Sequence, residues 1–473
     1  MPATDLRRAR MVFLLVPLTV LGLLILAFTA FQLRIRAQTR DYEARARARK
    51  EPLTLRTLAA AHYAAIPDHE NAAVPLLALW ETEHPEYWRA FRQGSRKLPE
   101  KPDAPSIPFP KVNDRVEADS GEASAESLQP LVSHVAARSD YREAVREALR
   151  RPGCRFPVRV TDGLFALLPH LARLKRDATE FRAEAWVATE RGDAETSVRA
   201  IRDCAQVGRL LDDDPFLIGQ LVRIACYSMC LIEVERLFSR LSPNEGQLGE
   251  LRAVIERLSA LDGFRRAMLC ERAMGLKVFE PPLGVLWDEA TSTQGSEEKA
   301  DLSALLLTLR LTGLQPLDRR LYMETFEHLL TNAPLDSPEK LVAVEIAITN
   351  TATRLKQFPP KIFSGMFLPA LKKAAQKFCQ LEALREGALT ALAIERYRLI
   401  HTGRTPETLT ELVPDLLPGI PRDPFDGQPL RYRRLEQGYV VYSVGPDRID
   451  HGGREKPKKG GTSQFDVTFT VRR

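Results

Sequence analysis

Few residues of this 473-residue chain combine a reactive side chain with a spacing that enzymes or metal sites use. Cys226 and Cys230 are four residues apart on one face of an apolar segment, where buried free thiols are a simpler interpretation than metal ligands. His69-Glu70 lacks the second histidine of a zinc-protease helix, and the eight histidines are scattered singly, as surface or capping residues are. Asp423-Pro424 and Asp426-Gly427 offer carboxylates, but both dipeptides are typical of turns. The sequence also has no phosphate-binding loop and no nucleophile elbow, so we predict a non-enzymatic protein.

The longest apolar segment is Met11–Leu33, which contains 23 residues and no charged side chain. As a helix rising about 1.5 Å per residue it is about 34 Å long, enough to cross a hydrocarbon core of about 30 Å. The three arginines before it would also suit a cleaved signal peptide, whose apolar core is usually only about 7–15 residues long. We therefore predict an uncleaved transmembrane helix, residues 11–33, behind a basic head, residues 1–10.

The positive charge of the chain is concentrated around this segment. Residues 1–50 contain ten Lys and Arg against three Asp and Glu, whereas the other 423 residues contain 58 against 59. The body therefore has no basic excess for nucleic acid, and we expect no such partner. Three of the ten precede the apolar segment and seven follow it, which favours a cytoplasmic body. A short basic head before a single anchor is instead the usual layout for an exported body.

Helical patterns dominate the chain up to residue 364. A charged helical stalk, residues 34–58, leads into a helical domain, residues 59–364, with loops near 99–125 and 280–299 that are rich in Pro and polar residues. Arg182–Leu211 is similar to a tetratricopeptide-type helix pair, but no regular repeat follows it. We therefore expect antiparallel helices stacked as an irregular, α-solenoid-like body. The predicted helices include Ser127–Arg150, Phe165–Arg191, Ala194–Leu211 and a buried central helix, Phe216–Arg240.

Three further helix starts are predicted from a Ser or Thr cap followed by Pro at the first helical position. These are Ser242-Pro243, Ser337-Pro338 and Thr405-Pro406.

Residues 365–473 differ in pattern from the helical body. Met366–Ile400 predicts a long helix, and three short segments rich in Tyr, Val or alternating apolar residues predict strands. The segments are Leu430–Arg434, Gly438–Val444 and Phe465–Val471. The expected fold is therefore mainly α, with a small C-terminal α+β module that contains a short antiparallel sheet.

This module resembles the C-terminal domain of the major pseudopilin of type II secretion. Ala393–Pro406 is similar to the end of the family's long helix, with Thr405 in place of an aromatic residue. Asp423–Tyr432 matches a D-P-[WF]-x-G-x-P-[YL]-x-Y element, and Tyr442–Asp447 matches Y-S-x-G-x-D. Met11–Leu33 lacks the Gly-Phe junction of a pseudopilin leader. We therefore interpret the module as a domain that is fused to the C-terminal end of a helical domain. As a whole, the chain looks like membrane-anchored proteins of planctomycete-type bacteria.

The resemblance implies a calcium site in the last loop. In the family, carbonyl and carboxylate oxygens of this loop bind Ca²⁺, a hard cation that takes about six to eight oxygen ligands. Carried over by position, Val444 supplies a carbonyl and Asp447 and Asp466 supply carboxylates, with Asp450 as an extra ligand on the same turn. The alternative is that these are ordinary turn residues, since Asp and Gly suit turn geometry.

These features favour a membrane-anchored, non-enzymatic scaffold or interaction protein of the cell envelope, associated with a type II secretion-like apparatus. The resembled module is extracytoplasmic, so we expect the body on that side of the membrane. Two alternatives stay open: an envelope hydrolase whose site forms only in three dimensions, and a divergent pseudopilin.

Overall fold

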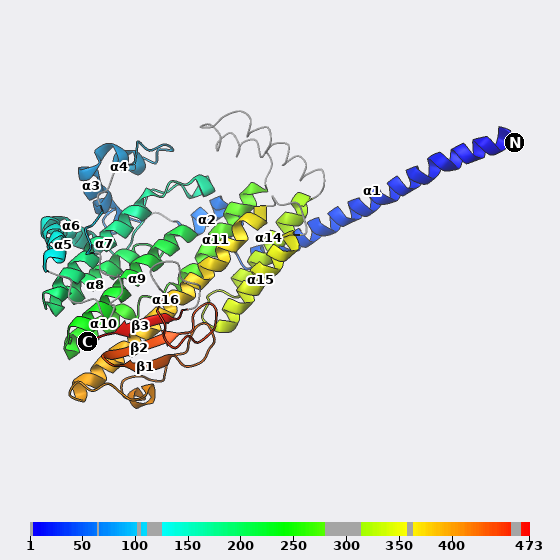
Figure 1. Ribbon diagram of the computed structural model, residues 1–473. Helices are drawn as coiled ribbons and strands as arrows, with labels where there is room; N and C mark the ends of the chain where they lie inside the picture. Colours follow the sequence, from blue (N-terminus) through cyan, green and yellow to red (C-terminus); the bar gives the residue numbers. More distant parts are fainter. Residues whose placement is uncertain are drawn as a thin grey trace.

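The computed structural model describes residues 3–63, 66–101, 106–110, 125–279, 314–356, 363–455 and 465–473. The predicted loop 280–299 and most of the predicted loop 99–125 lie outside the described residues. Most of the described chain is helical, and the strands are confined to its C-terminal end, so the mainly α prediction is confirmed. The regular repetition of a solenoid is not evident, because the helices differ in length and direction (Figure 1).

The first helix, α1 (Ala3–Ala48), projects from the body as one long rod (Figure 1). Its apolar stretch is long enough to cross a membrane, and its C-terminal half packs on α14 (Leu314–Thr331), which buries Ile35 and Ala46. The stalk was expected to stay helical to residue 58, which is wrong: the helix ends at Ala48. Lys50 then takes a positive φ of 56°, and a separate helix, α2 (Leu55–His62), begins after a Thr54 cap.

The next helices are short and surround an aromatic cluster. The predicted helix Ser127–Arg150 is in fact two helices, because the backbone leaves helical geometry at Arg138 (φ −104°, ψ 14°). His170 is fully buried between Phe91 and Phe156, with ring centroids 5.8 and 4.5 Å away, so the expectation of surface or capping histidines is wrong for this residue. The elements are α3 (Ala73–Glu83), α4 (Pro85–Arg92), α5 (Ala125–Ala137), α6 (Ser139–Leu149) and the 3₁₀ helix η1 (Val160–Phe165).

Three long helices form the centre of the body: α7 (Pro169–Glu190), α8 (Ala194–Arg209) and α9 (Leu217–Arg240). The prediction of a buried central helix at α9 is confirmed, and Cys226 and Cys230 on it are fully buried free thiols. Helices α8 and α9 approach closely at Gly208, where a Cβ atom would lie only 2.6 Å from the Tyr227 ring. Buried charges are paired, as in the Arg182–Glu233 contact of 2.9 Å.

The remaining helices run beside this centre: α10 (Glu245–Ile255), α11 (Leu261–Val278), α14, α15 (Pro338–Lys356) and α16 (Phe363–Ile400). The predicted start at Ser337-Pro338 is confirmed. The start at Ser242 is wrong by two residues, because Asn244 caps α10 through a capping box with Gln247. No α-helix follows Thr405-Pro406; a 3₁₀ helix, η2 (Leu409–Leu412), begins there behind a Thr408 cap.

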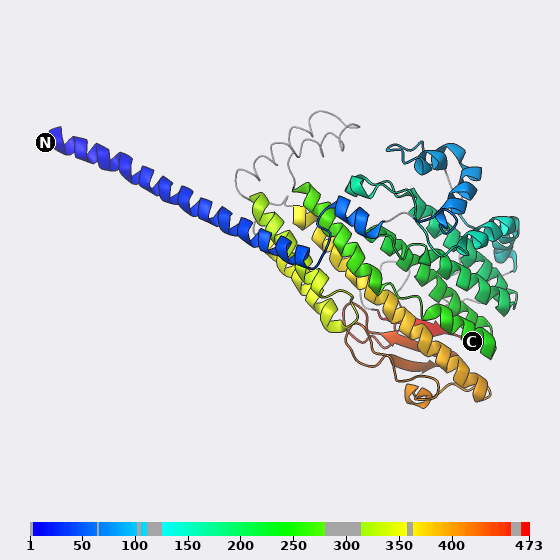
Figure 2. The same ribbon diagram turned by 180° about the vertical axis from the view of Figure 1, so that it is seen from behind.

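The sheet contains β1 (Arg431–Leu435), β2 (Gly438–Ser443) and β3 (Val467–Val471) in the order β1-β2-β3, with both pairs antiparallel. It packs against α9 and α16, and in the rear view of Figure 2 α16 crosses in front of the strands. Phe469 contacts Phe238 of α9 at 6.3 Å between ring centroids, and Thr470 N donates to Glu235 of α9 at 2.6 Å. One hydrophobic core therefore extends from Leu55 to Val471.

Candidate functional site

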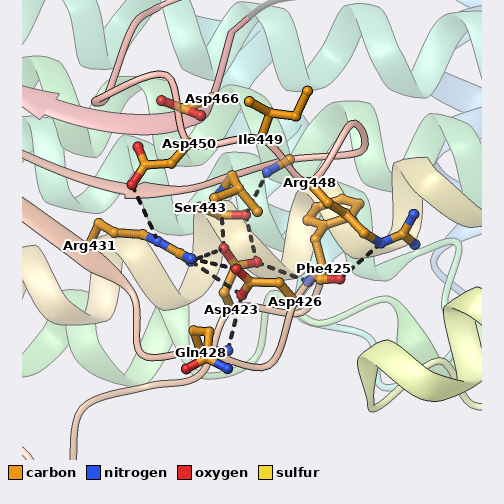
Figure 3. Close-up of polar contacts among 12 residues, drawn as sticks. Asp423, Phe425, Asp426, Gln428, Arg431, Ser443, Arg448, Ile449, Asp450 and Asp466 are labelled. Atoms are coloured by element: carbon orange, nitrogen blue, oxygen red, sulfur yellow. Dashed lines mark hydrogen bonds and ion pairs between the residues drawn. The ribbon is translucent and has the colours of Figure 1, made fainter.

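The turn before β1 and the loop after β2 meet around one fully buried carboxylate, that of Asp423 (Figure 3). Its Oδ1 accepts hydrogen bonds from Phe425 N at 2.9 Å and from Ser443 Oγ at 2.8 Å. Its Oδ2 accepts from Val444 N at 2.9 Å and from Arg431 Nη1 at 2.7 Å. The carboxylate therefore joins the turn to both neighbouring strands.

The local sequence explains why the chain turns here. Asp423 N donates to Gln428 O at 2.8 Å, and Gly427, with a φ of 73°, donates its N–H to Asp423 O. Glycine takes that backbone conformation without steric cost. Phe425 is 1% exposed and anchors the turn in the core. The D-P-F-D-G stretch was predicted to be a turn, and the structure has one there.

Arg431 is surrounded by three carboxylates. Besides Asp423, its guanidinium binds both oxygens of Asp426, one of them at 3.2 Å, and its Nε lies 4.0 Å from Asp450 Oδ2. Burial raises the pKa of Asp423 against the opposing effect of its hydrogen bonds. Desolvation acts to raise the pKa of Asp426, but its hydrogen bonds to Arg431 and Gln428 N and the charge of Arg431 together outweigh it, so the pKa is lowered. The guanidinium thus occupies the position between the carboxylates.

The residues predicted to bind calcium lie on the same loop, and each carboxylate already accepts hydrogen bonds within it. Asp466 accepts from His451 N at 3.2 Å and from Gly453 N at 2.7 Å. Asp447 accepts from Ile449 N at 3.2 Å, and its Oδ2 lies 3.1 Å from His451 Nε2.

The other two predicted ligands are Asp450 and the carbonyl of Val444. Asp450 accepts a hydrogen bond from Gly452 N at 2.8 Å, and the backbone N–H of Val444 is committed to Asp423. In the part of the chain that the structure describes, no group of three or more His, Cys, Asp or Glu side chains is arranged to hold a metal ion. Calcium binding therefore stays a prediction.

Two contributors to this site could not be found from sequence. Arg448, at a positive φ of 59°, donates from Nε to Phe425 O at 3.1 Å and pairs with Glu345 of α15 at 2.8 Å. Ser443 holds Asp423 from the end of β2. Both contacts join residues far apart in the chain, and no local pattern marks them.

What the arrangement can do chemically follows from its charge. The three carboxylates around Arg431 leave the cluster with an excess of negative charge. The Asp450 side chain is 50% exposed, whereas Asp423 is inaccessible. The cluster can therefore hold the 444–455 loop in one conformation.

Comparisons with known proteins add no relative. No family model, no curated protein and no solved structure matches this chain. The pseudopilin and tetratricopeptide resemblances therefore rest on the motifs alone.

A cavity of about 370 Å³ lies at the other end of the sheet, between the end of α16 and the β1–β2 turn. Three arginines line it, and each is paired: Arg398 with Glu395 at 2.8 Å, Arg473 with Glu395 at 2.6 Å, and Arg434 with Glu407 at 2.5 Å. Tyr439 also donates to Glu395 at 2.8 Å. The charges of the three lining arginines are therefore compensated by carboxylates of the protein itself.

Proposed function

We propose that this protein is a single-pass membrane-anchored, non-enzymatic scaffold or interaction protein of the cell envelope. The observation that carries the proposal is α1, one continuous helix whose stretch from Leu18 to Leu33 is apolar and exposed and whose last part is packed into the body. A helix built in this way joins the body to a membrane without a flexible linker.

The exposed apolar side chains of α1 indicate what surrounds it. Ten large apolar side chains of this helix are 44–65% exposed. Burying such a side chain is worth about 1.5–3 kcal/mol, so a bilayer would stabilise this segment by more than about 10 kcal/mol relative to water. They are Leu18, Val20, Leu21, Leu23, Leu24, Ile25, Leu26, Phe28, Phe31 and Leu33.

Helix α9 passes the same test of length and composition but has a different environment. Of its apolar window, 61% is buried inside the body, compared with 6% for α1. A core helix meets protein on all sides, whereas α1 does not. This contrast supports one membrane span, by α1.

The buried carboxylates of the body support a structural, and not a catalytic, role for these side chains. Asp177 accepts hydrogen bonds from Trp80 and Tyr141, and Glu233 pairs with Arg182. Asp423 is committed to four donors. Such pairing is what buried charges need for stability, since an unpaired one is costly.

The extracytoplasmic placement and the link to a type II secretion-like apparatus are supported by the pseudopilin resemblance of residues 365–473. In cells that carry such an apparatus, cross-linking followed by mass spectrometry should join the 444–455 loop to a component of it. Recovery of cross-links only to unrelated proteins would contradict that link.

Membrane anchoring is tested by alkaline extraction of membranes that contain the full chain. The wild type should stay in the pellet, and a Leu23→Lys/Leu26→Lys variant should move to the supernatant, because each charge at a helix centre costs about 2.5–3.5 kcal/mol. The matched control is Ala37→Lys/Ala44→Lys, which adds the same charges to exposed positions of the same helix beyond the apolar segment. Extraction of the wild type at alkaline pH would overturn the proposal.

A further inference from the structure

A second cavity, of about 330 Å³, lies where α1 meets the body, immediately beyond the apolar segment. It is formed between α1, Phe279 just after α11, and the start of α14. Its lining combines guanidinium groups with apolar surface: Arg36, Thr39, Arg40, Glu43, Phe279, Gln315, Pro316 and Arg319.

The arginines of this cavity differ from those of the cavity beside the sheet. Arg36 and Arg40 are exposed, and neither has an ion pair or hydrogen bond to any residue that the structure describes. Arg319 donates from Nη2 to Glu43 at 2.8 Å, but its Nε is buried and has no hydrogen-bond partner. Among the described residues that line the cavity, three guanidinium groups therefore face one carboxylate, and one buried donor is unsatisfied.

The depth of the cavity along α1 follows from helix geometry. Arg36 and Arg40 come three and seven residues after Leu33, which is about 5 and 10 Å further along the helix at about 1.5 Å per residue. The headgroup region on each side of a bilayer is about 5–8 Å thick, outside a hydrocarbon core of about 30 Å. When α1 spans the membrane, Arg36 lies at the level of the headgroups and Arg40 just outside it, so the cavity opens at the boundary between headgroups and water.

We propose that this cavity binds the phosphate group of an anionic phospholipid. Guanidinium groups bind phosphate oxygens in a fork geometry, and a basic pocket beside a membrane helix suits an anionic headgroup. Phe279 and Pro316 give the headgroup an apolar wall to pack against. The site deepens the proposed function, since it rests on α1 as a membrane anchor. A bound headgroup would fix the angle between anchor and body.

The test uses the full chain in detergent, titrated with short-chain phosphatidylglycerol and, in parallel, with phosphatidylcholine of the same chain length. Native mass spectrometry counts the bound lipids. We expect phosphatidylglycerol to bind at least tenfold more tightly than phosphatidylcholine at physiological salt, and Arg36→Gln/Arg40→Gln to remove this preference. The matched control is Arg34→Gln, which removes an exposed charge that is closer to the membrane but does not line the cavity.

Inorganic phosphate forms a separate arm of the titration. Competition with phosphatidylglycerol at millimolar phosphate supports the phosphate chemistry. Binding of inorganic phosphate without any preference for phosphatidylglycerol would overturn the lipid as the source. An equal loss of binding in Arg34→Gln and in Arg36→Gln/Arg40→Gln would show general surface attraction and overturn the pocket. Because the titration needs no membrane, these results are independent of alkaline extraction, which tests the anchor itself.

Discussion

Replacing Asp423 by Ala should loosen the C-terminal turn and the start of the 444–455 loop together. Alanine removes the acceptor for two buried backbone N–H groups, those of Phe425 and Val444, and for the Ser443 hydroxyl. Arg431 would keep its contacts to Asp426. The main loss is therefore that of the two backbone hydrogen bonds.

The size of the effect follows from these two groups. Leaving a buried donor unsatisfied costs about 1–3 kcal/mol, so two of them cost about 2–6 kcal/mol. We expect about 3 kcal/mol, since water can enter the space left by the carboxylate. This corresponds to an approximately hundredfold change in the local opening equilibrium.

Hydrogen–deuterium exchange of the full chain measures that equilibrium for individual segments. The amides of Phe425 and Val444 should exchange about a hundredfold faster in Asp423→Ala, whereas those of α9 should be unchanged. Asp426→Ala is the matched control, because its partly exposed ion pair with Arg431 is worth at most about 1 kcal/mol. An equal or larger effect in Asp426→Ala would refute the view that the buried carboxylate holds the turn.

Three further predictions concern pH, calcium and helix packing. Burial raises the pKa of Glu271 to about 7 from a usual value of 4.5, so the folded state holds a proton there that the unfolded state releases. The free energy of unfolding should therefore fall by on the order of 2 kcal/mol as the pH rises from about 5 to 8. Denaturant titrations at these two pH values measure the difference, and Glu271→Gln should remove it. If Ca²⁺ binds the last loop, calcium at about 100 times Kd should stabilise the full chain by about 2.7 kcal/mol relative to chelator. Asp447→Ala should abolish the resulting shift in melting temperature. Identical melting curves of the wild type with calcium and with chelator would mean that the aspartates of this loop are turn residues only. Gly208→Ala should lower the melting temperature because its Cβ would meet the Tyr227 ring, whereas Gly249→Ala, a helical position with open space, should raise it; the reverse order would contradict close α8–α9 packing.

Periodicity and caps predicted much of the fold. The helices α7, α8, α9 and α16 and all three strands lie close to their predicted positions, because each has a strong pattern of apolar residues over its own length. The failures are positions where tertiary contacts override local signals. The predicted 127–150 helix breaks at Arg138, whose guanidinium stacks on Tyr141 at 3.8 Å and pairs with Glu83 at 2.7 Å.

The candidate site was predicted less completely than the fold. The motifs marked the loop and the turn, but Asp423 was interpreted as an ordinary turn residue although it is the buried centre of the network. Its partners Ser443 and Val444 are about twenty residues away, so their convergence depends on the hairpin register. Arg448 and Glu345 are further apart still and are brought together only when the loop docks on α15.

The side of the membrane on which the body lies tests the central claim most directly. Two reporters fused after Arg473 are compared in cells, one active only outside the cytoplasm and one active only inside it. The account predicts activity of the first reporter alone, with the fusion protein in the membrane fraction and residues 1–33 retained in its intact mass. Activity of the cytoplasmic reporter alone, or loss of residues 1–33, would contradict it.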